Sequence, residues 1–378
     1  MKEHKICARC VMDSSDCDIS FNDEGYCNHC VDALSVRDSF VNKGEKGIKN
    51  LEQKIGEIKK RNKNKEFDAL IGLSGGVDSS YAAILAHKAG LRLLAVHCDT
   101  GWNSEQATHN IHSLVNSLGI DLETVVVDWE SISDLQSAFF RASVPNCDIP
   151  QDHAIVAVNN LVADKFRLKD FISGGNFATE SILPGSWGHD ARDLKHIKAI
   201  SRLFGIRDLR GFPHIGSFKS YIWLPFVKGI RNYRILNDVD YNREKVVDIL
   251  TANHGWKNYG GKHHESRFTK FFQSFYLPEK FGFDKRKAHY SSLIIDGQIS
   301  RDEALNLLKI PPYDSNSLIA DTEYFLKKLG FNQSQWKAIM DSPPKRHDAY
   351  PNQLRLHKYR TWLKESLEKK NIRVRRNW

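Results

Sequence analysis

The stretch FDALIGLSGGVDSSYAAILAHKAG (67–90) joins an apolar run, a turn of serines and glycines, and an alanine-rich segment. The run DALIGL predicts a buried strand, and SYAAILAHKAG predicts a helix that ends near Gly90. Between them, the turn SGGVDS (74–79) brings two glycines to a helix start, where backbone N–H groups can surround an anion. The stretch therefore predicts a strand, a phosphate-binding turn and a helix.

Two common phosphate motifs do not fit this turn. The motif G-x-x-x-x-G-K-[ST] needs a Gly-Lys pair, and the chain's one such pair is Gly261-Lys262, with Trp256 where a glycine is required. The dinucleotide fingerprint G-x-G-x-x-G also fails at 72–79. The residues that we expect to hold phosphate are Ser74, Gly75, Gly76, Ser79 and Ser80. Asp78 is expected to bind Mg²⁺ or to orient a donor.

The chain on both sides of this turn predicts an α/β fold. Apolar runs at LRLLAVHCD, LETVVVDW and DFISGG are separated by helical patterns, which implies right-handed crossovers and a parallel sheet. A further strand is predicted at SYIWLPFV (220–227). Beyond about residue 240 the pattern is helical as far as LRLHKYRTWLKESLEKK (354–370).

These patterns divide the chain into four expected parts. Residues 1–35 are cysteine-dense, and residues 36–66 form a charged linker helix. Residues 67–240 form the nucleotide-binding domain, in which 181–219 has no clean period and is expected to be an insert or lid. Residues 241–378 form a helical domain for a substrate or partner.

The N-terminal cysteines predict a metal site. Cys7 and Cys10 form one Cys-x-x-Cys pair, and Cys27 and Cys30 form a second one 16 residues later. Two such pairs can close a tetrahedral shell of four sulfurs around Zn²⁺, which leaves no open position for a substrate. We therefore expect structural zinc; an iron–sulfur cluster and reduced core cysteines are the alternatives. Cys17 and His29 are candidates for a substituted ligand.

Composition and charge limit the function classes. The 378 residues carry a net charge of +9 and a mean hydropathy of −0.47. There is no run of 18 apolar residues, so we expect no membrane span, and MKEHKICARC has no secretory h-region. The expected location is the cytoplasm. Basic stretches such as KKNIRVRRNW can serve nucleic acid, but charge alone favours a solvated face.

The pattern Ser-Gly-Gly-x-Asp-Ser between a strand and a helix resembles the PP-loop of the ATP pyrophosphatases, which include GMP, NAD, argininosuccinate and asparagine synthetases and tRNA thiolases. The resemblance implies an adenine nucleotide alpha hydrolase-like domain that splits ATP between its α- and β-phosphates. The loop would hold the departing pyrophosphate. By the same resemblance, the nucleotide site is shaped by His97, Asp99, Gly174, Gly175, Asn176 and Glu180. Each of these alone also fits an ordinary turn at a strand end.

A narrower resemblance covers the chain from Cys7 to about Leu308. The four cysteines, SGGVDSS, CDIPQDHAIVAVNN, ISGGNFATES and WKNYGGKHHESRFTKFFQ together resemble the N-acetyl sugar amidotransferases, the WbpG/PseA-like proteins of bacterial surface-polysaccharide synthesis. This implies that ATP adenylates the amide oxygen of an acetamido sugar, with a nucleotide-linked sugar as the expected form, and that ammonia then forms an acetamidine. By this resemblance Lys262 and Arg267 stabilise charge between the phosphates, and Glu265 accepts a proton from ammonia.

The expected partners follow from the ammonia. Residue 2 is Lys, so the chain has no N-terminal cysteine for an internal glutaminase. We expect a separate glutaminase subunit, with a barrel-type channelling subunit as a further candidate. The rival interpretation is a tRNA sulfurtransferase, because that group also joins zinc knuckles to a PP-loop. Its catalytic cysteines would have to be Cys98 and Cys147.

Overall fold

The computed structural model describes residues 4–355 and residue 359. Its centre is a sheet of five parallel strands in the order β3-β2-β1-β4-β5. The strands are β1 (Ala69–Gly72), β2 (Leu93–Asp99), β3 (Asp121–Val126), β4 (Asp170–Ile172) and β5 (Arg231–Tyr233). The predicted α/β fold with a parallel sheet is confirmed. The basic tail and most of the helix predicted at 354–370 lie outside the described residues.

Strand β1 is buried on both faces because its alternate side chains enter two different cores. Ala69 and Ile71 pack with residues of α3 (Val77–Lys88) and α4 (Glu105–Leu118). Leu70 packs with residues of α6 (Ile149–Lys165) on the opposite face. Period-two alternation between two helical layers explains the continuous apolar run of this strand. It also places the turn after β1 at the edge where ligands bind in open α/β sheets.

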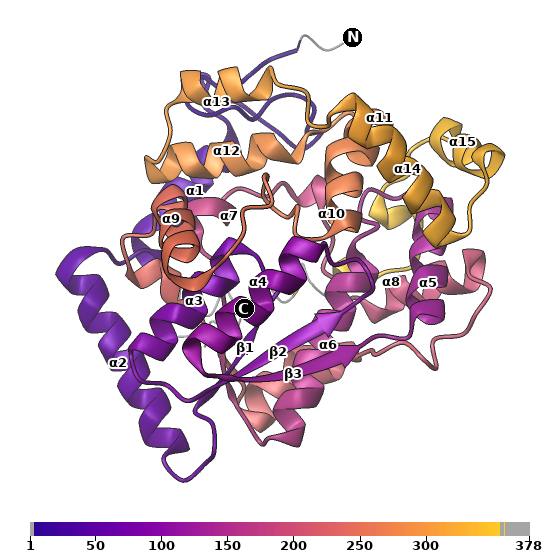
Figure 1. The fold of residues 1–378 in the computed structure, drawn as a ribbon. Helices are drawn as coiled ribbons and strands as arrows, with labels where there is room; N and C mark the ends of the chain where they lie inside the picture. The colour runs from indigo at the N-terminus through magenta and orange to yellow at the C-terminus, as the bar shows by residue number, and fades with distance from the viewer. Residues whose placement is uncertain (1–3, 356–358, 360–378) are drawn as a thin grey trace.

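The N-terminal part contains two helices where one linker helix was expected. Helix α1 (Asn28–Phe40) begins inside the second cysteine pair, and α2 (Gly44–Asn62) follows after extended backbone at Val41. Helix α2 packs on the 3-10 turn η3 (Ile235–Asp238), where the ammonium of Lys54 lies 2.5 Å from the Asp238 carboxylate. Figure 1 shows the N-terminal coil beside α12 and α13, away from the sheet.

The region before β5 differs from its sequence interpretation. Residues 181–219 contain the 3-10 turn η1 (Gly185–Trp187) and an unpredicted helix, α8 (Leu194–Phe204), which packs on α5 (Trp129–Ala142). The strand predicted at 220–227 is wrong, because these residues belong to the π-helix η2 (Lys219–Lys228). Tyr221 and Leu224 are its buried residues, and this spacing of three is helical. An apolar run alone does not separate a strand from a buried helix.

The predicted helical C-terminal region is confirmed. Its elements are α9 (Arg243–His254), α10 (Arg267–Phe271), the π-helix η4 (Phe272–Tyr276), α11 (Leu277–Phe281), α12 (Lys285–Asp296), α13 (Arg301–Leu308), α14 (Ser315–Leu329), α15 (Gln333–Asp341) and the 3-10 turn η5 (His347–Ala349). Helix α9 packs on α3, and the short α7 (Phe177–Glu180) packs on α12.

An aromatic cluster joins this region to the sheet domain. The ring of Phe140 in α5 lies 4.8 Å from that of Tyr276 and 5.3 Å from that of Phe325. Edge-to-face aromatic contacts of this kind add to the stabilisation from burial. Within the described residues, no helix combines the length and apolar character needed to cross a membrane.

Candidate functional site

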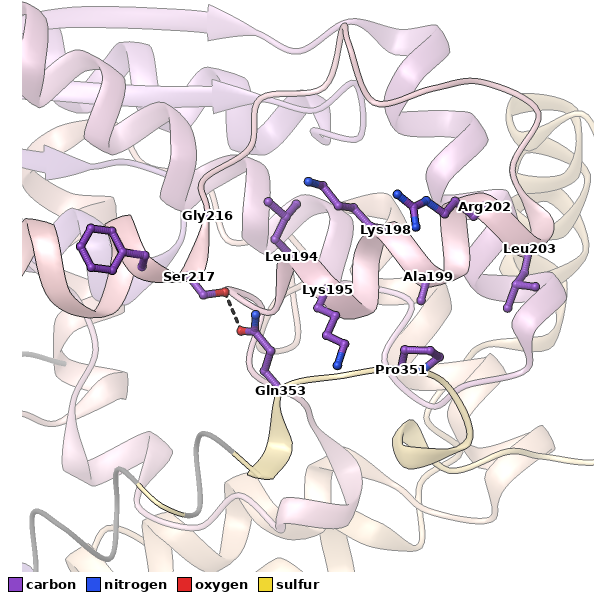
Figure 2. Close-up of a pocket in the computed structure, with 11 residues that line it drawn as sticks. Leu194, Lys195, Lys198, Ala199, Arg202, Leu203, Gly216, Ser217, Pro351 and Gln353 are labelled. Atoms are coloured by element: carbon purple, nitrogen blue, oxygen red, sulfur yellow. Dashed lines mark hydrogen bonds between the residues drawn. The ribbon is translucent and has the colours of Figure 1, made fainter.

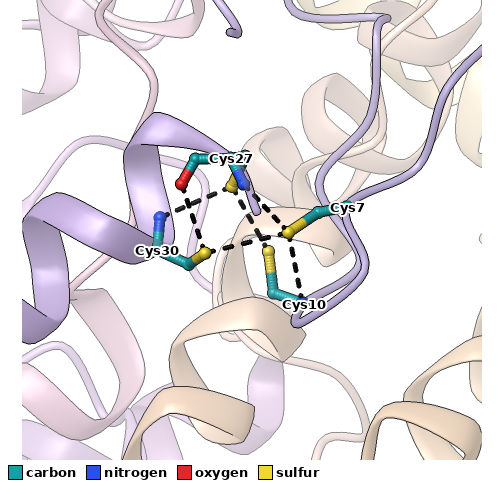
Figure 3. A group of neighbouring side chains, drawn as sticks. All are labelled: Cys7, Cys10, Cys27 and Cys30. Carbon is teal, nitrogen blue, oxygen red and sulfur yellow. Dashed lines mark hydrogen bonds between the residues drawn. The ribbon is translucent and has the colours of Figure 1, made fainter. Parts of the chain in front are cut away.

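The four cysteines predicted as zinc ligands form one buried cluster (Figure 3). Their sulfur atoms all lie within 4.8 Å of one another, with 3.7 Å between Cys7 and Cys30 and 3.5 Å between Cys10 and Cys27. Zinc–sulfur bonds of about 2.3 Å in a tetrahedron would separate the sulfurs by about 3.8 Å. The cluster therefore has the size and donor set of a closed four-thiolate zinc site.

Backbone N–H groups surround this cluster. Those of Cys10 and Cys27 both donate to Sγ of Cys7, at 3.4 and 3.2 Å. Such donors stabilise the thiolate charge that a metal site requires. Cys17 and His29, the two candidates for a substituted ligand, lie outside this cluster. Cys17 is exposed, and Nε2 of His29 lies 2.5 Å from a carboxylate oxygen of Asp16.

The cluster is fastened to the C-terminal helices. The guanidinium of Arg301 in α13 donates to the carbonyl oxygens of Cys7 and Cys10, at 3.0 and 3.2 Å. The N–H of Val11 donates to Oγ of Ser291 in α12 at 3.2 Å. The N-terminal coil and the C-terminal helices are therefore joined at this cluster.

The glycine turn connects the carboxyl end of β1 to α3, as the sequence predicts. Gly75 has a φ of +77°, and a Cβ there would lie 2.5 Å from the carbonyl oxygen of Ala107. A Cβ on Gly174, which follows β4, would lie 2.7 Å from the backbone nitrogen of Ser79. The turn is thus enclosed by neighbouring backbone on two sides, which only glycine permits.

The serine hydroxyls of the turn fall into two groups. Ser74 is exposed, and its Oγ lies 3.4 Å from Oγ of Ser79 at the start of α3. Ser80 is buried, and its Oγ has no hydrogen-bond partner among the described residues. Ser74 and Ser79 can meet an anion at the positive end of the helix. The role expected for Ser80 stays a prediction.

Asp78 lies in the first turn of α3 and is held by Tyr241, whose hydroxyl donates to Oδ1. The ammonium of Lys262 is 3.9 Å from Oδ2. Burial raises the pKa of Asp78, while the charge of Lys262 acts to lower it. Carboxylate oxygens are suitable Mg²⁺ ligands, and the predicted magnesium role of Asp78 stays a prediction.

Residues 256–266, here termed the covering segment, run across the glycine turn. Nε1 of Trp256 donates to the carbonyl oxygen of Gly75, and the N–H of Val77 donates to the hydroxyl of Tyr259, both at 3.2 Å. The far end is fixed because the N–H of Ser104, beyond β2, donates to the carbonyl oxygen of Glu265 at 2.9 Å. The first part of the stretch WKNYGGKHHESRFTKFFQ, which carries the narrower resemblance, therefore lies on the glycine turn.

Lys262 joins the covering segment to α7. Its Nζ donates to Oγ1 of Thr179 at 2.9 Å and lies 3.3 Å from Oε1 of Glu180. Burial raises the pKa of Glu180, but the charges of Lys262, His263 and Arg234 together outweigh this, and the pKa is lowered. Lys262 is thus held between two carboxylates, those of Asp78 and Glu180.

The two residues predicted at the end of β2 belong to one hydrogen-bond network. Nδ1 of His97 donates to the carbonyl oxygen of Leu73 at 2.9 Å. The amide of Asn103 donates to Nε2 of His97 at 2.8 Å and to Oδ1 of Asp99 at 3.1 Å. This network ties the ends of β1 and β2 together beside the glycine turn.

The residues predicted after β4 position Glu180. Oδ1 of Asn176 accepts the N–H of Thr179 at 2.9 Å and so caps α7. A Cβ on Gly175 would lie 3.4 Å from Oε2 of Glu180. Arg267, in contrast, contacts α14: its guanidinium donates to Asp321 at 2.8 Å and lies 3.6 Å from the ring centroid of Tyr324. Its predicted role at the phosphates stays a prediction.

The sequence assigned no role to four side chains at this site. Trp256, Tyr259, Tyr241 and Asn110 all contact the first residues of the glycine turn or α3. For Trp256 and Tyr259 a signal was present, because both belong to the stretch WKNYGGKHHESRFTKFFQ that carries the narrower resemblance. Tyr241 and Asn110 stand in ordinary contexts, so only the fold brings them here.

The two isolated cysteines lack the surroundings of a nucleophile. Burial raises the pKa of Cys98 to about 12, with the charge of Asp99 acting in the same direction. Burial also raises the pKa of Cys147, whose thiol donates to the carbonyl oxygen of Val144 at 3.4 Å. Reactive cysteines have a lowered pKa and partial exposure. Both thiols therefore remain protonated in this conformation.

A separate hollow of about 700 Å³ lies between α8 and two loops (Figure 2). Its lining includes Leu194, Lys195, Lys198, Ala199, Arg202, Leu203, Gly216, Ser217, Phe218, Pro351 and Gln353. None of these residues belongs to the glycine turn or to the covering segment. The side chains of Lys195 and Lys198 point away from each other, so the hollow lacks a convergent charged centre.

Two family models match the chain. Residues 265–364 match "LPS biosynthesis protein WbpG-like, C-terminal domain", and residues 48–161 match "NAD synthase". The first match begins where the covering segment ends, and the second contains the glycine turn. The solved NH3-dependent NAD synthetase from Campylobacter jejuni covers 75% of this chain and 96% of its own, with 14% identity and a TM-score of 0.28.

Curated relatives match over shorter spans. GMP synthase from Lactobacillus johnsonii is 30% identical over 225 residues, which are 52% of this chain and 40% of the relative. GMP synthase from Chlamydia caviae is 40% identical over 82 residues, 21% of this chain and 14% of the relative. A probable mitochondrial tRNA-specific 2-thiouridylase from Caenorhabditis elegans is 27% identical over 154 residues, 37% and 40% of the two chains.

The chain spans less than half the length of each of these curated relatives. The two family matches lie in different parts of the fold: the NAD synthase match is in the sheet domain, and the WbpG-like match is in the C-terminal helices. The chain therefore combines a PP-loop domain that is similar to NAD synthase with C-terminal helices that match the WbpG-like domain.

Proposed function

We propose that this protein is an ATP-dependent amidotransferase that converts an acetamido sugar into an acetamidino sugar. The observation that carries the proposal is the contact of the covering segment with the PP-loop at Gly75, Val77 and Asp78. The covering segment leads directly into the WbpG-like helices, which supports a site made from both regions.

The chemistry starts from the weakness of an amide as an electrophile. The amide oxygen attacks the α-phosphate of ATP, and pyrophosphate leaves. The adenylated oxygen is then a good leaving group. Ammonia adds to the imidate carbon, and AMP departs with the former amide oxygen. Water must be excluded, because hydrolysis would return the amide.

The residues at the turn suit the first of these steps. Ser74, Gly75, Gly76 and Ser79 would hold the pyrophosphate at the start of α3, with Asp78 as the candidate ligand for Mg²⁺. Lys262 would stabilise the charge that develops between the α- and β-phosphates. The metal supplies further charge neutralisation when bound. The four-cysteine cluster would hold Zn²⁺ for folding rather than for the reaction.

The proposed substrate and partners follow from the resemblance to the N-acetyl sugar amidotransferases. We propose a nucleotide-linked acetamido sugar of surface-polysaccharide synthesis as acceptor, in the cytoplasm where nucleotide sugars are made. A separate glutaminase subunit, with or without a barrel-type channelling subunit, would supply ammonia. The tRNA sulfurtransferase alternative has support in the thiouridylase relative. The raised thiol pKa values of the half-buried Cys98 and the buried Cys147 favour the amidotransferase.

The test is mass spectrometry of a panel of UDP- and CMP-linked acetamido sugars incubated with the protein, ATP, Mg²⁺ and ammonium. Replacement of oxygen by NH lowers the substrate mass by about one unit, and AMP should accumulate in equal amount. Reactions without ammonium or without sugar are the controls. Accumulation of ADP, or an unchanged mass across the panel, would contradict the proposal. ATP-dependent sulfur transfer to tRNA would establish the rival.

A further inference from the structure

We propose that His263 is the catalytic base that takes a proton from the attacking ammonia, and that Glu265 is the residue that positions it. This assignment rests on the proposed function. It revises the expectation from the sequence, in which Glu265 itself received the proton. The observations that carry it are the backbone of His263, its contact with Glu265, and the ring of polar groups around it.

The backbone places His263 differently from its neighbour. His263 has a φ of +64°, in the left-handed region that histidine adopts at a cost on the order of 1 kcal/mol. Its side chain keeps 43% of its surface exposed. The adjacent His264 turns inward, where Nδ1 accepts the N–H of Gly261 at 3.2 Å and burial lowers its pKa to about 4. One histidine supports the loop, and the other keeps its ring partly exposed beside Glu265.

Glu265 has the properties of an orienting carboxylate. Its Oε1 lies 3.6 Å from Nδ1 of His263, and the side chain is only 14% exposed. Oε2 is buried and has no hydrogen-bond partner among the described residues. Burial raises the pKa of Glu265, but the contact and charge of His263, a backbone donor and the charge of Lys262 together lower it. An ionised carboxylate facing Nδ1 leaves Nε2 as the nitrogen that accepts a proton.

Glu265 also connects this pair to the PP-loop. A Cβ on Gly76 would lie 3.1 Å from Oε1 of Glu265, so the carboxylate sits against the first turn of α3. The positive end of a helix favours such an anion. The pair is therefore fixed beside the turn that would hold the phosphates of the adenylating step.

Charged and titratable groups from several elements interact electrostatically with His263. Its charge affects the pKa values of Asp78 in α3, Asp152 in α6, Glu180 in α7, His289 in α12, and His264 and Glu265 beside it. The carboxylates among them would stabilise the imidazolium formed on proton transfer. Lys262, between Asp78 and Glu180, opposes this effect.

The step balances in atoms and charge. The ammonia nitrogen forms a bond to the imidate carbon, and the bond from that carbon to the adenylyl oxygen breaks. AMP leaves with the oxygen that was the amide oxygen. The nitrogen loses one proton to Nε2 of His263, which releases it to solvent, and the product is the amidinium.

The experiment replaces His263 by glycine, which accepts the left-handed backbone without strain. Amidine formation from ammonium should fall about 100-fold, within the range of acid–base contributions. Sugar-dependent exchange of labelled pyrophosphate into ATP, which reports adenylation alone, should be retained. Added imidazole should restore amidine formation in H263G without raising the wild-type rate. His112→Ala, at an exposed histidine of α4, is the matched control and should behave as wild type.

The outcomes separate this assignment from the function on which it rests. If wild type forms neither AMP nor amidine with any sugar, the proposed function fails. If wild type is active and H263G keeps the full amidine rate, or loses exchange in parallel, His263 is not the base. Glu265→Gln should reduce amidine formation less than H263G and alter its dependence on pH. An unchanged pH profile in E265Q would overturn the positioning role.

Discussion

The four-cysteine cluster is formed by residues that are close in the sequence, whereas the PP-loop site is formed by residues that are far apart in it. Each half of the cluster is a local unit, because Cys7 with Cys10, and Cys27 with Cys30, are only three residues apart. The PP-loop site draws on α3, α7 and the covering segment, and the residues of Lys262's contacts with α3 and α7 are more than 80 positions apart in the chain. A local site can be recognised from spacing, whereas a dispersed one depends on how the domains pack.

Disrupting the four-cysteine cluster should have the largest effect on the stability of the protein. Cys10→Ser removes one of four ligands, and structural zinc contributes about 10–16 kcal/mol in small domains, comparable to the whole stability of a typical protein. Because Arg301 and Ser291 bind the cluster backbone, we expect α12 and α13 to lose their support. The expected result is loss of bound zinc and of soluble protein, measured by metal analysis and thermal unfolding.

Cys17→Ser is the control for this change, because Cys17 is exposed and lies outside the four-sulfur cluster. It should retain both zinc and the melting temperature. Full zinc content and normal unfolding in C10S would refute the structural role of the cluster.

Disrupting the PP-loop site should abolish AMP formation, with a smaller loss of stability than the change in the cysteine cluster. In Gly75→Ala the new Cβ would meet the Ala107 carbonyl at 2.5 Å, on a backbone with φ of +77°. The turn must shift, so we expect ATP binding by calorimetry and AMP formation to fall at least about 100-fold. Gly56→Ala in α2, where a Cβ meets nothing within 4 Å, should leave both unchanged and stabilise by up to about 1 kcal/mol.

Acid should destabilise the fold through buried histidines that belong to neither of these two sites. Burial lowers the pKa of His196 to about 4 and that of His347 to about 3. The unfolded state therefore binds protons more readily, so the stability that these neutral rings provide is complete above about pH 6.5 and is lost as the pH falls toward 4. Between pH 7.5 and 5 we expect a loss of about 2 kcal/mol for each ring.

Urea unfolding at the two pH values measures this loss, with zinc content followed in parallel. His196→Leu should reduce the difference between the two pH values. If the variant shows the same difference and zinc is released first, the acid sensitivity belongs to the cysteine cluster.

The smallest effect is expected at Cys98, which lies next to the site but carries none of its chemistry in the proposed reaction. Its raised pKa of about 12 keeps the thiol protonated at neutral pH. Cys98→Ser should therefore retain AMP and amidine formation, and iodoacetamide should label wild-type Cys98 slowly at pH 8. Rapid labelling together with inactivation of C98S would revive the sulfurtransferase interpretation.

Several features could be predicted because their signals are local. The strand, turn and helix at 67–90 follow from periodicity and two glycines, and the cysteine cluster follows from spacing. The strand expected at 220–227 failed because an apolar run has no period to distinguish it from the π-helix that forms there. Helix α8 was missed because the surrounding segment 181–219 is rich in Gly, His and Arg, a composition typical of loops.

The amino-acid sequence by itself determined the parallel sheet, the position of the PP-loop and the four-cysteine cluster, because neighbouring residues carry each of these. Tertiary structure decided which side chains meet that loop. Tyr241 reaches Asp78 across 163 positions, and Tyr259 reaches Val77 across 182. It also gave His263 and His264 different surroundings, since His263 has a left-handed backbone and contacts Glu265, whereas His264 accepts the N–H of Gly261. Such choices depend on packing between distant segments, which spacing in the chain does not record.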